Sequence, residues 1–304
     1  MFKKIGCVVV TYNRKELLAE AVSSILQQSY PVSRIIIIDN HSTDGTEVYL
    51  KEKKLITNKV EYIRLDKNLG GSAGFYYGLK KAITTDVEWI SLSDDDAILK
   101  NDYFENIVVQ VQEYPKVKAF TGTVVTNNKI QYFHRRFITS SYTLKHRVSS
   151  EIDYKGKTFF LDSFSFVGCL IHKDIIQKVG LPEIGYFTQL DDTEYSLRIR
   201  HETNILNVNN AIIDHKTKIL DQQSYKPDWK EFYSIRNQCF MILKHSKNKI
   251  FARIYFPLLI LKKMMESLTS GKYDKYRKYR IGLLKDVYLS VFREQQGVNE
   301  KYLP

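Results

Sequence analysis

The 304-residue sequence contains few cysteines and few of the residues that interrupt regular structure. Its three cysteines, Cys7, Cys169 and Cys239, are far apart, which excludes a disulfide framework and indicates reduced thiols in a cytoplasmic compartment. The 14 glycines and 6 prolines are too few for a long low-complexity linker, and no internal repeat is present. Apolar runs are also short, since none reaches the ~20 residues that a membrane-spanning helix needs. The run at 5–10 has no signal-peptide cleavage site and is therefore expected to be a first core strand.

Acidic residues are fewer than basic residues, and most of the excess positive charge lies in one part of the chain. The chain has 34 Asp and Glu against 46 Lys and Arg, a formal net charge of +12. Residues 226–304 alone hold 17 Lys and Arg against 7 Asp and Glu, so the C-terminal region carries most of the excess. Such a basic region fits nucleic acid or an anionic membrane surface.

Strand and helix patterns alternate through the first 92 residues. Buried strands are expected at 5–10, 35–38, 60–65 and 87–92, with helices at 15–28 and 74–83. This alternation predicts an α/β fold, a doubly wound and mostly parallel sheet with right-handed crossovers. Mixed β structure is expected over 117–170, a short helix at 174–180, a helix from Asp191 and a strand at 205–213. From Trp229 onward the pattern is helical nearly to the end.

Polar segments follow each of the four predicted parallel strands, at 11–14, 39–46, 66–74 and 93–96. Ligands of open α/β sheets bind beyond the carboxyl ends of the strands. These four segments are therefore expected to gather at one edge of the sheet and to form a binding site.

Three consecutive carboxylates, Asp94, Asp95 and Asp96, end the fourth predicted strand. Repulsion and desolvation would both raise their pKa values, and a divalent cation such as Mg²⁺ or Mn²⁺ would relieve both penalties. A solvated acidic loop is the alternative. His215 also ends a predicted strand, and imidazole suits Mn²⁺, although loop histidines are commonly just solvated. The remaining histidines offer no neighbours that suggest chemistry: His134, His146, His172, His201 and His245.

Two further segments have both a functional and a structural explanation. Gly70, Gly71 and Gly74 precede or open a predicted helix, where backbone can approach an anionic ligand, but a plain turn explains them equally well. Their spacing is not that of a dinucleotide-binding loop. Asp39 could accept a hydrogen bond from a ribose or a base, or could form a turn with Ser42 and Thr43.

Paired acids open the predicted helix at Asp191 and Asp192. One of the pair could act as a general base, because its neighbour raises its pKa towards the working pH. Complementing the helix dipole is the structural alternative. The preceding aromatic segment 185–188 is of the kind that lines a sugar site.

Taken in order, these motifs resemble those of a known enzyme family. Val8-Val9-Val10-Thr11-Tyr12-Asn13-Arg14, Ile38-Asp39-Asn40-His41-Ser42-Thr43-Asp44-Gly45-Thr46, Asn68-Leu69-Gly70-Gly71-Ser72-Ala73-Gly74-Phe75 and Asp94-Asp95-Asp96 are similar to the motifs of family 2 inverting nucleotide-sugar glycosyltransferases, which have the GT-A fold. The glycine-rich segment is most similar to that of bacterial galactofuranosyltransferases and rhamnosyltransferases. The resemblance covers about residues 5–240.

The resemblance implies a metal-dependent enzyme that moves galactofuranose or another hexose from a UDP-sugar to a hydroxyl group. The acceptor would be a lipid-linked or growing polysaccharide of a bacterial capsule, O-antigen or cell wall. A dTDP-rhamnose donor is the alternative within the family. Gln189-Leu190 stands where the galactofuranosyl branch often has a tryptophan before the paired acids, which leaves sugar and acceptor open.

The resemblance also implies roles for individual residues. The donor would be held by Thr11, Tyr12, Asn13, Arg14, Asp39, Asn40, Asn68, Gly70, Gly71, Gly74, Asp94 and Asp95. A Mn²⁺ or Mg²⁺ ion would be bound by Asp94, Asp96 and His215. Asp192 would be the catalytic base, with Asp191 as the other candidate.

These inferences predict a catalytic domain over 1–225, with a Rossmann-like nucleotide-sugar half and a mixed-sheet acceptor half, followed by a basic helical region over 226–304. The apolar segment 250–261 and the Lys/Tyr-rich segment 272–280 suit a helix lying on the inner face of the cell membrane, or an oligomer contact. The donor motifs argue against nucleic acid. Two other functions stay open, a nucleotidyltransferase, for which no triphosphate-binding loop is evident, and a non-catalytic sugar-nucleotide-binding module.

Overall fold

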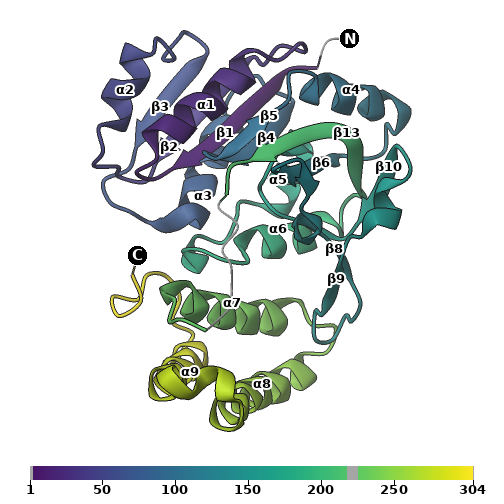
Figure 1. The fold of residues 1–304 in the computed structure, drawn as a ribbon. Helices are drawn as coiled ribbons and strands as arrows, with labels where there is room; N and C mark the ends of the chain where they lie inside the picture. Colours follow the sequence, from purple (N-terminus) through teal and green to yellow (C-terminus); the bar gives the residue numbers. More distant parts are fainter. Residues whose placement is uncertain (1–2, 218–224, 304) are drawn as a thin grey trace. The chain divides into compact units, whose positions relative to one another are not determined.

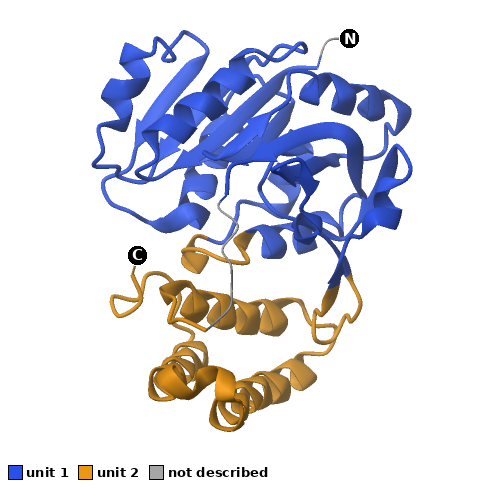
Figure 2. Ribbon diagram, in the orientation of Figure 1, with its two compact units in different colours: residues 1–137, 147–183, 192–217 blue, residues 138–146, 184–191, 218–304 orange. Residues whose placement is uncertain are grey.

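The computed structural model describes residues 3–217 and 225–303 and divides into two compact units (Figure 2). Unit 1 contains residues 1–137, 147–183 and 192–217, and unit 2 contains residues 138–146, 184–191 and 218–304. Segments 138–146 and 184–191 therefore group with the C-terminal helices, although they lie within the predicted catalytic domain. The predicted boundary at residue 225 stays a prediction.

Unit 1 is built on one large sheet with the strand order β10-β13-β6-β12-β4-β1-β2-β3 (Figure 1). Its parallel half consists of β1 (Ile5–Thr11), β2 (Arg34–Asp39), β3 (Val60–Arg64) and β4 (Trp89–Asp94). Thr11 pairs with Asp39, Asp39 with Arg64, and Val10 with Asp94. All four strands therefore end at the same edge, as the sequence predicts.

The other half of the sheet is mixed. β12 (Cys169–His172) runs antiparallel between β4 and β6 (Ala119–Thr126), and β13 (Ile205–His215) runs parallel to β6. The short strands β5 (Ala97–Leu99), β7 (Lys129–Ile130) and β10 (Thr158–Leu161) also belong to this sheet. A separate small sheet has the order β11-β8-β9 and consists of β8 (Arg135–Ile138), β9 (His146–Val148) and β11 (Ser163–Phe164). This arrangement confirms the α/β class, with one mostly parallel half and one mixed half of the sheet.

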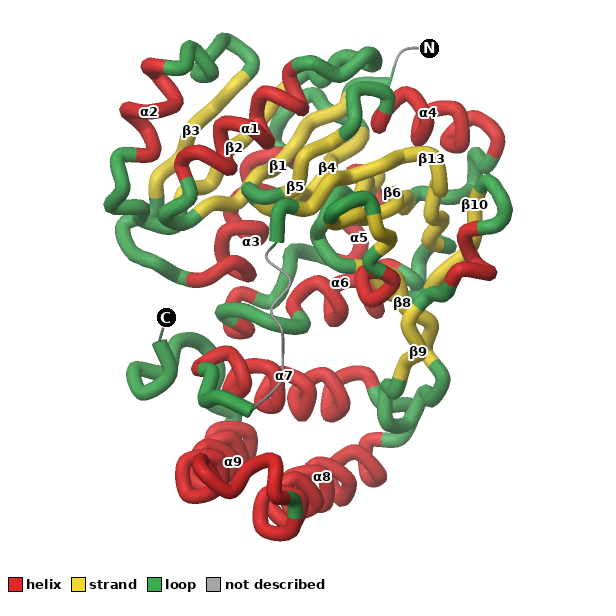
Figure 3. Tube along the Cα trace, in the orientation of Figure 1, coloured by secondary structure: helices red, strands yellow, loops and turns green. Residues whose placement is uncertain are grey.

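Alternate residues of β1 enter two separate cores, as the two-residue period of a strand requires. Ile5, Cys7 and Val9 belong to one core with residues of α1 (Lys15–Leu26) and α4 (Tyr103–Glu113). Val8 and Val10 belong to the other with residues of α3 (Gly70–Ala82) and α5 (Lys173–Val179). The sheet is therefore covered on both faces, the doubly wound arrangement; Figure 3 shows its strands in yellow and the helices in red.

The helices begin close to their predicted positions, with one informative exception. α2 (Thr46–Glu52) and α6 (Asp191–Ile199) follow the predicted turns. The third helix was expected from Gly74, but α3 begins at Gly70. The glycine-rich segment is thus the first turn of the helix, whereas the sequence predicts a loop before it.

The described part of unit 2 includes the α-helices α7 (Trp229–His245), α8 (Lys249–Thr269) and α9 (Arg277–Phe292), each in contact with the other two. Their core includes Phe232, Tyr233 and Leu283, and the rings of Tyr186 and Phe187 from the 184–191 segment are buried in the same core. Among the described residues, no helix has both the length and the apolar character needed to cross a bilayer.

Candidate functional site

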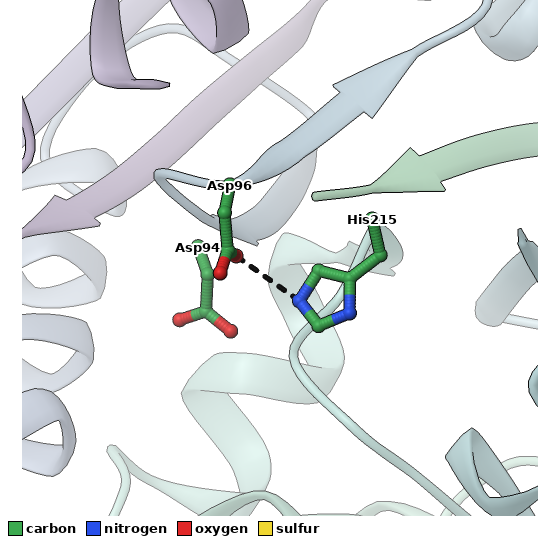
Figure 4. A group of neighbouring side chains, drawn as sticks. All are labelled: Asp94, Asp96 and His215. Carbon is green, nitrogen blue, oxygen red and sulfur yellow. Dashed lines mark ion pairs between the residues drawn. The ribbon is translucent and has the colours of Figure 1, made fainter. Parts of the chain in front are cut away.

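The three residues predicted to bind a metal come together in unit 1, although the chain separates His215 widely from the acids. Asp94 is the last residue of β4, Asp96 follows two positions later, and His215 ends β13. Their ligand atoms lie within 4.8 Å of one another. Figure 4 shows the imidazole directed at Asp96, with His215 Nε2 3.0 Å from Asp96 Oδ1. Because β5 pairs antiparallel with β13, Ala97 faces His215 and fixes this proximity.

The donor chemistry of this triad fits a divalent cation. Two carboxylates and one imidazole are ligands that Mn²⁺ and Mg²⁺ accept, with the imidazole favouring Mn²⁺. Asp96 Oδ1 is buried and, apart from His215, has no partner among the described residues. Burial alone would raise the pKa of Asp96, but His215 and the Arg14 guanidinium lower it below its usual value. The carboxylate is therefore kept ionised and ready to bind a cation.

Asp95 is held by the first loop of the sheet edge and differs from its neighbours. It is buried, with Thr11 Oγ1 donating to Oδ2 at 2.7 Å and Arg14 Nη1 lying 3.2 Å from Oδ1. Arg14 Nη1 also lies 2.9 Å from Asp96 Oδ2. Burial raises the pKa of Asp95 to about 6, although Arg14 and Thr11 oppose the shift. The Arg14 guanidinium, half of it exposed, thus links the loop after β1 to two of the three acids.

The loops after β1 and β2 are tied to each other by polar contacts. Asn13, at φ 53°, donates its backbone N–H to Ser42 Oγ at 2.9 Å and accepts from the Thr43 N–H at 2.7 Å. Asn40 is buried, and its Oδ1 has no hydrogen-bond partner among the described residues. An unpaired buried amide oxygen is costly, so Asn40 is a ready acceptor for a ligand N–H at this edge.

Asp39 forms the turn with the residues that follow it, which is the structural role that the sequence predicts as one alternative. Its Oδ1 accepts from the Ser42 N–H at 2.8 Å, and Tyr62 donates its hydroxyl to Oδ2. Arg64 Nε lies 3.8 Å from the same Oδ2. Only 1% of Asp39 is exposed. Its predicted contact with a nucleotide stays a prediction, whereas its part in the turn is confirmed.

The glycines of α3 have separable explanations. Gly70 has φ 84°, a left-handed conformation that favours glycine, and its N–H donates to Asn68 Oδ1 at 2.9 Å. A Cβ on Gly74 would lie 2.4 Å from Val10 Cγ1, so close packing of α3 on β1 accounts for this glycine. A Cβ on Gly71 would meet nothing within 4 Å. Gly71 therefore has open space beside it, and the fold alone does not require a glycine there.

Asp192 lies in the first turn of α6, beside a cation that the sequence analysis did not identify. Arg136 Nη2 is 3.9 Å from Asp192 Oδ2, and Arg136 also donates to Thr193 Oγ1 at 2.5 Å. The Thr193 N–H donates to Asp192 Oδ1 at 2.5 Å. Two residues further on, Glu194 is buried in an ion pair with Arg198, with 2.9 Å between Oε2 and Nη2. The acids of this motif thus differ, because Glu194 is a structural residue and Asp192 is partly exposed.

His134 is a residue that sequence reasoning missed. It was expected to lack neighbours with chemistry, and that expectation is wrong, because its ring packs edge-on against His215 with 5.3 Å between centroids. His134 Nδ1 lies 2.6 Å from Ser165 Oγ, while the buried Nε2 has no partner among the described residues. Burial and the nearby charges of Arg135 and His215 lower the pKa of His134 well below its usual value. No local sequence signal identifies it, since the contact joins two distant segments.

The segment before Asp191 has an unusual backbone. Phe187, Gln189 and Leu190 all have φ between 63° and 66°, which non-glycine residues rarely adopt. The buried Asn237 amide stabilises this conformation by donating to the carbonyls of Tyr186, Thr188 and Gln189 at 2.8–3.0 Å.

The rings of this segment do not have the role expected of them. Tyr186 and Phe187 are buried in the core of unit 2, and Phe187 packs on Tyr233 with 4.9 Å between centroids. The expectation that this aromatic segment lines a sugar site is therefore wrong for these two rings, because they are occupied by helix packing.

Comparison with proteins of known sequence gives a family. The family model described as "Glycosyl transferase family 2" matches residues 7–180. A galactofuranosyltransferase, GlfT1 of Mycolicibacterium smegmatis, is 24% identical over 206 residues, 64% of this chain and 65% of its own length. A poly-beta-1,6-N-acetyl-D-glucosamine synthase of Staphylococcus epidermidis is 28% identical over 125 residues, 41% of this chain and 29% of the relative. The chain thus spans less than two thirds of these relatives.

Solved structures share the fold at low sequence identity. A structure of GalNAc-T7 with UDP, GalNAc and Mn²⁺ has a TM-score of 0.65 at 14% identity, covering 96% of this chain and 57% of the other. A structure of S. aureus TarS residues 1–349 in complex with UDP-GlcNAc has a TM-score of 0.59 at 14% identity, covering 95% and 81%. The family match covers more than half of the 304 residues and includes the loops that gather Thr11, Asp39 and the three acids. The chain therefore belongs to glycosyl transferase family 2.

Proposed function

We propose that this protein is a divalent-metal-dependent, inverting glycosyltransferase that uses a nucleotide-sugar donor. The observation that carries the proposal is the convergence of Asp94, Asp96 and His215 within 4.8 Å, at the carboxyl edge of a GT-A sheet. The family match and the UDP and UDP-GlcNAc complexes of structural neighbours support a nucleotide sugar as the donor.

The donor would lie along the edge formed by the loops after β1, β2 and β4 and by the start of α3. The unpaired Asn40 Oδ1 suits a base N–H, and the open side of Gly71 suits close approach of the ligand. Arg14 supplies a partly exposed cation for the diphosphate. The remaining donor contacts predicted from the motifs are part of the same proposal: Thr11, Tyr12, Asn13, Asp39, Asn68, Gly70, Gly74, Asp94 and Asp95.

Asp94, Asp96 and His215 would hold Mn²⁺ or Mg²⁺. When bound, the cation stabilises the negative charge of the departing diphosphate as a Lewis acid. Arg14 offsets part of the negative charge of Asp95 and Asp96. The Arg14 guanidinium would also bind the donor phosphates, because its fixed set of N–H donors suits phosphate oxygens.

In the proposed reaction Asp192 accepts the proton of an acceptor hydroxyl. The hydroxyl oxygen forms a bond to the anomeric carbon on the face opposite the nucleotide. The bond from that carbon to the diphosphate oxygen breaks, and the nucleotide diphosphate leaves with the electron pair. This single displacement inverts the anomeric configuration. Arg136, 3.9 Å from Asp192, orients the carboxylate; Asp191 is the other candidate base.

The relatives named above suggest a bacterial surface glycan as the product, since they include a galactofuranosyltransferase and a poly-N-acetylglucosamine synthase. We propose UDP-galactofuranose or another UDP-hexose as the donor and a lipid-linked or growing glycan as the acceptor. Such an acceptor places the enzyme at the cytoplasmic face of the cell membrane as a peripheral protein.

A donor screen tests this proposal. Thermal unfolding with Mn²⁺ would be compared for UDP-galactofuranose, UDP-galactopyranose, UDP-glucose, dTDP-rhamnose and the nucleoside triphosphates UTP and dTTP, with EDTA as the control. A true donor at a hundred times its dissociation constant adds about 2.7 kcal/mol to the free energy of unfolding. A response to dTDP-rhamnose alone would indicate a rhamnosyltransferase, and a response only to nucleoside triphosphates would indicate a nucleotidyltransferase.

The variant Asp192→Asn separates binding from catalysis. It should bind donor like the unchanged protein and lose roughly 100- to 10,000-fold in kcat, because general-base catalysis contributes that factor. Donor binding with no turnover in either protein would instead support a non-catalytic sugar-nucleotide-binding module.

A further inference from the structure

Helix α8 of unit 2 exposes a continuous apolar stripe. Six large apolar side chains recur along it at intervals of three or four residues, and each is from 49% to 73% exposed: Ile250, Ile254, Leu258, Leu261, Met265 and Leu268. At 100° per residue these positions span an arc of about 80° on the helix surface. The stripe therefore runs along nearly the whole of α8 rather than forming scattered exposed residues.

The opposite face of α8 is already used for packing. Ala252, Phe256 and Ile260 are buried, and Phe256 and Ile260 belong to the core shared with α7 and α9. The exposed stripe is thus not the core face of a poorly packed helix. The core of unit 2 uses only one apolar face of α8, and the helix has a second apolar face that is exposed. An exposed apolar surface of this kind indicates a site that binds a partner or a membrane.

Positive charge borders the stripe. Arg253 and Lys262 are exposed and lie on either side of it at helical spacing. Over residues 244–285 the chain has 12 Lys and Arg against 2 Asp and Glu. The exposed members of this set include Lys247 and Lys249 at the start of α8 and Lys272, Lys275 and Lys278 beyond its end.

We propose that the stripe of α8 is a membrane-docking surface, which lies in the plane of a bilayer and inserts its apolar side chains among anionic lipids. An apolar stripe bordered by cations is typical of helices at such an interface. Each Lys or Arg near an anionic surface strengthens binding by roughly fivefold. Pairing with a second copy through the same face would bring two strongly basic surfaces together, so charge favours the lipid.

This inference deepens the proposed function, because a membrane-bound enzyme meets lipid-linked acceptors, but its test does not require catalysis. Sedimentation with vesicles of phosphatidylcholine and phosphatidylglycerol measures binding of the full chain. The unchanged protein should bind these vesicles, bind pure phosphatidylcholine much more weakly, and dissociate as salt is raised.

The double variant Leu258→Gln with Leu261→Gln should lower the partition coefficient more than tenfold, since burial of one leucine is worth about that factor. The matched control, Val109→Gln with Ile152→Gln, removes two exposed apolar residues from unit 1 and should bind like the unchanged protein. Equal vesicle binding by both double variants would overturn the proposal. So would a dimer that the Leu258 and Leu261 changes dissociate, because a second copy would then cover the stripe.

A second variant tests insertion directly. Leu258→Trp, made together with Trp229→Phe, places a reporter on the stripe, and the one remaining native tryptophan, Trp89, is buried in unit 1. Its fluorescence should shift to the blue with anionic vesicles and be quenched by brominated lipid; an unchanged spectrum would overturn insertion. UDP binding, measured without vesicles, should be the same in all variants. Vesicle binding without donor binding would support the docking surface and refute the proposed function. Donor binding without vesicle binding would support the proposed function and refute the docking surface.

Discussion

Two substitutions at the glycine-rich start of α3 can distinguish a glycine needed for packing against β1 from a glycine needed for close approach of a ligand. In Gly74→Ala the new Cβ would lie 2.4 Å from Val10 Cγ1 and 3.1 Å from Asn40 Nδ2. Valine is stiff about χ1, so the strand side must yield, at a cost of ~1–3 kcal/mol. The better helix propensity of alanine returns about 1 kcal/mol. The net expectation is a loss of about 1 kcal/mol in the free energy of unfolding.

Gly71→Ala is the matched control, because its Cβ would meet nothing within 4 Å and its φ is not positive. It should leave the free energy of unfolding unchanged or raise it by up to about 1 kcal/mol. Urea unfolding measures the free energy of unfolding of both variants. Titration calorimetry with UDP then measures the affinity of each variant for UDP. Gly71→Ala should weaken UDP binding although the protein is fully stable. The reasoning about α3 and β1 fails if Gly74→Ala is as stable as Gly71→Ala.

Two further predictions concern buried side chains of unit 1 and the thiols. His134→Asn should raise the Mn²⁺ dissociation constant by roughly tenfold, because the ring that packs on His215 is lost. The control variant His201→Asn changes an exposed histidine and should leave the dissociation constant unchanged. Both constants are measured by Mn²⁺ titration monitored by electron paramagnetic resonance. Equal affinities would show that His134 does not support the metal site. Burial raises the pKa of all three thiols, so none should react with Ellman's reagent at pH 8 in the native protein and all should react in urea: Cys7, Cys169 and Cys239. Rapid reaction of the native protein would contradict the buried placement.

The sequence was sufficient for features encoded in one segment or in the periodicity of a strand. Ile35–Ile38 predicts a strand buried on both faces, and β2 is such a strand. Since parallel strands share an edge, the positions of Asp39 and Asp94 relative to Thr11 followed from the alternation of elements. The start of α6 at Asp191 was also predictable from the acids that open it.

Contacts between distant segments could not be predicted in the same way. The approach of His134 to His215 depends on a 3-10 turn before β8 and on the end of β13, and neither segment carries a signal for it. Arg136 reaches Asp192 across 56 positions of sequence for the same reason. The burial of Tyr186 and Phe187 was missed because aromatic residues in a loop suit a sugar site and a helix core equally well.

The amide of Asn237 has a consequence for how this chain can be dissected. Its hydrogen bonds, together with those from Arg236 to the carbonyls of Gly185 and Tyr186, hold a left-handed backbone that three ordinary residues would not adopt unaided. A shortened protein ending before α7 would lose both side chains, and residues 187–190 would relax to commoner backbone angles. Trimming the C-terminal helices would therefore alter the stretch that leads directly into Asp191 and Asp192, so the helical region is not a detachable appendage.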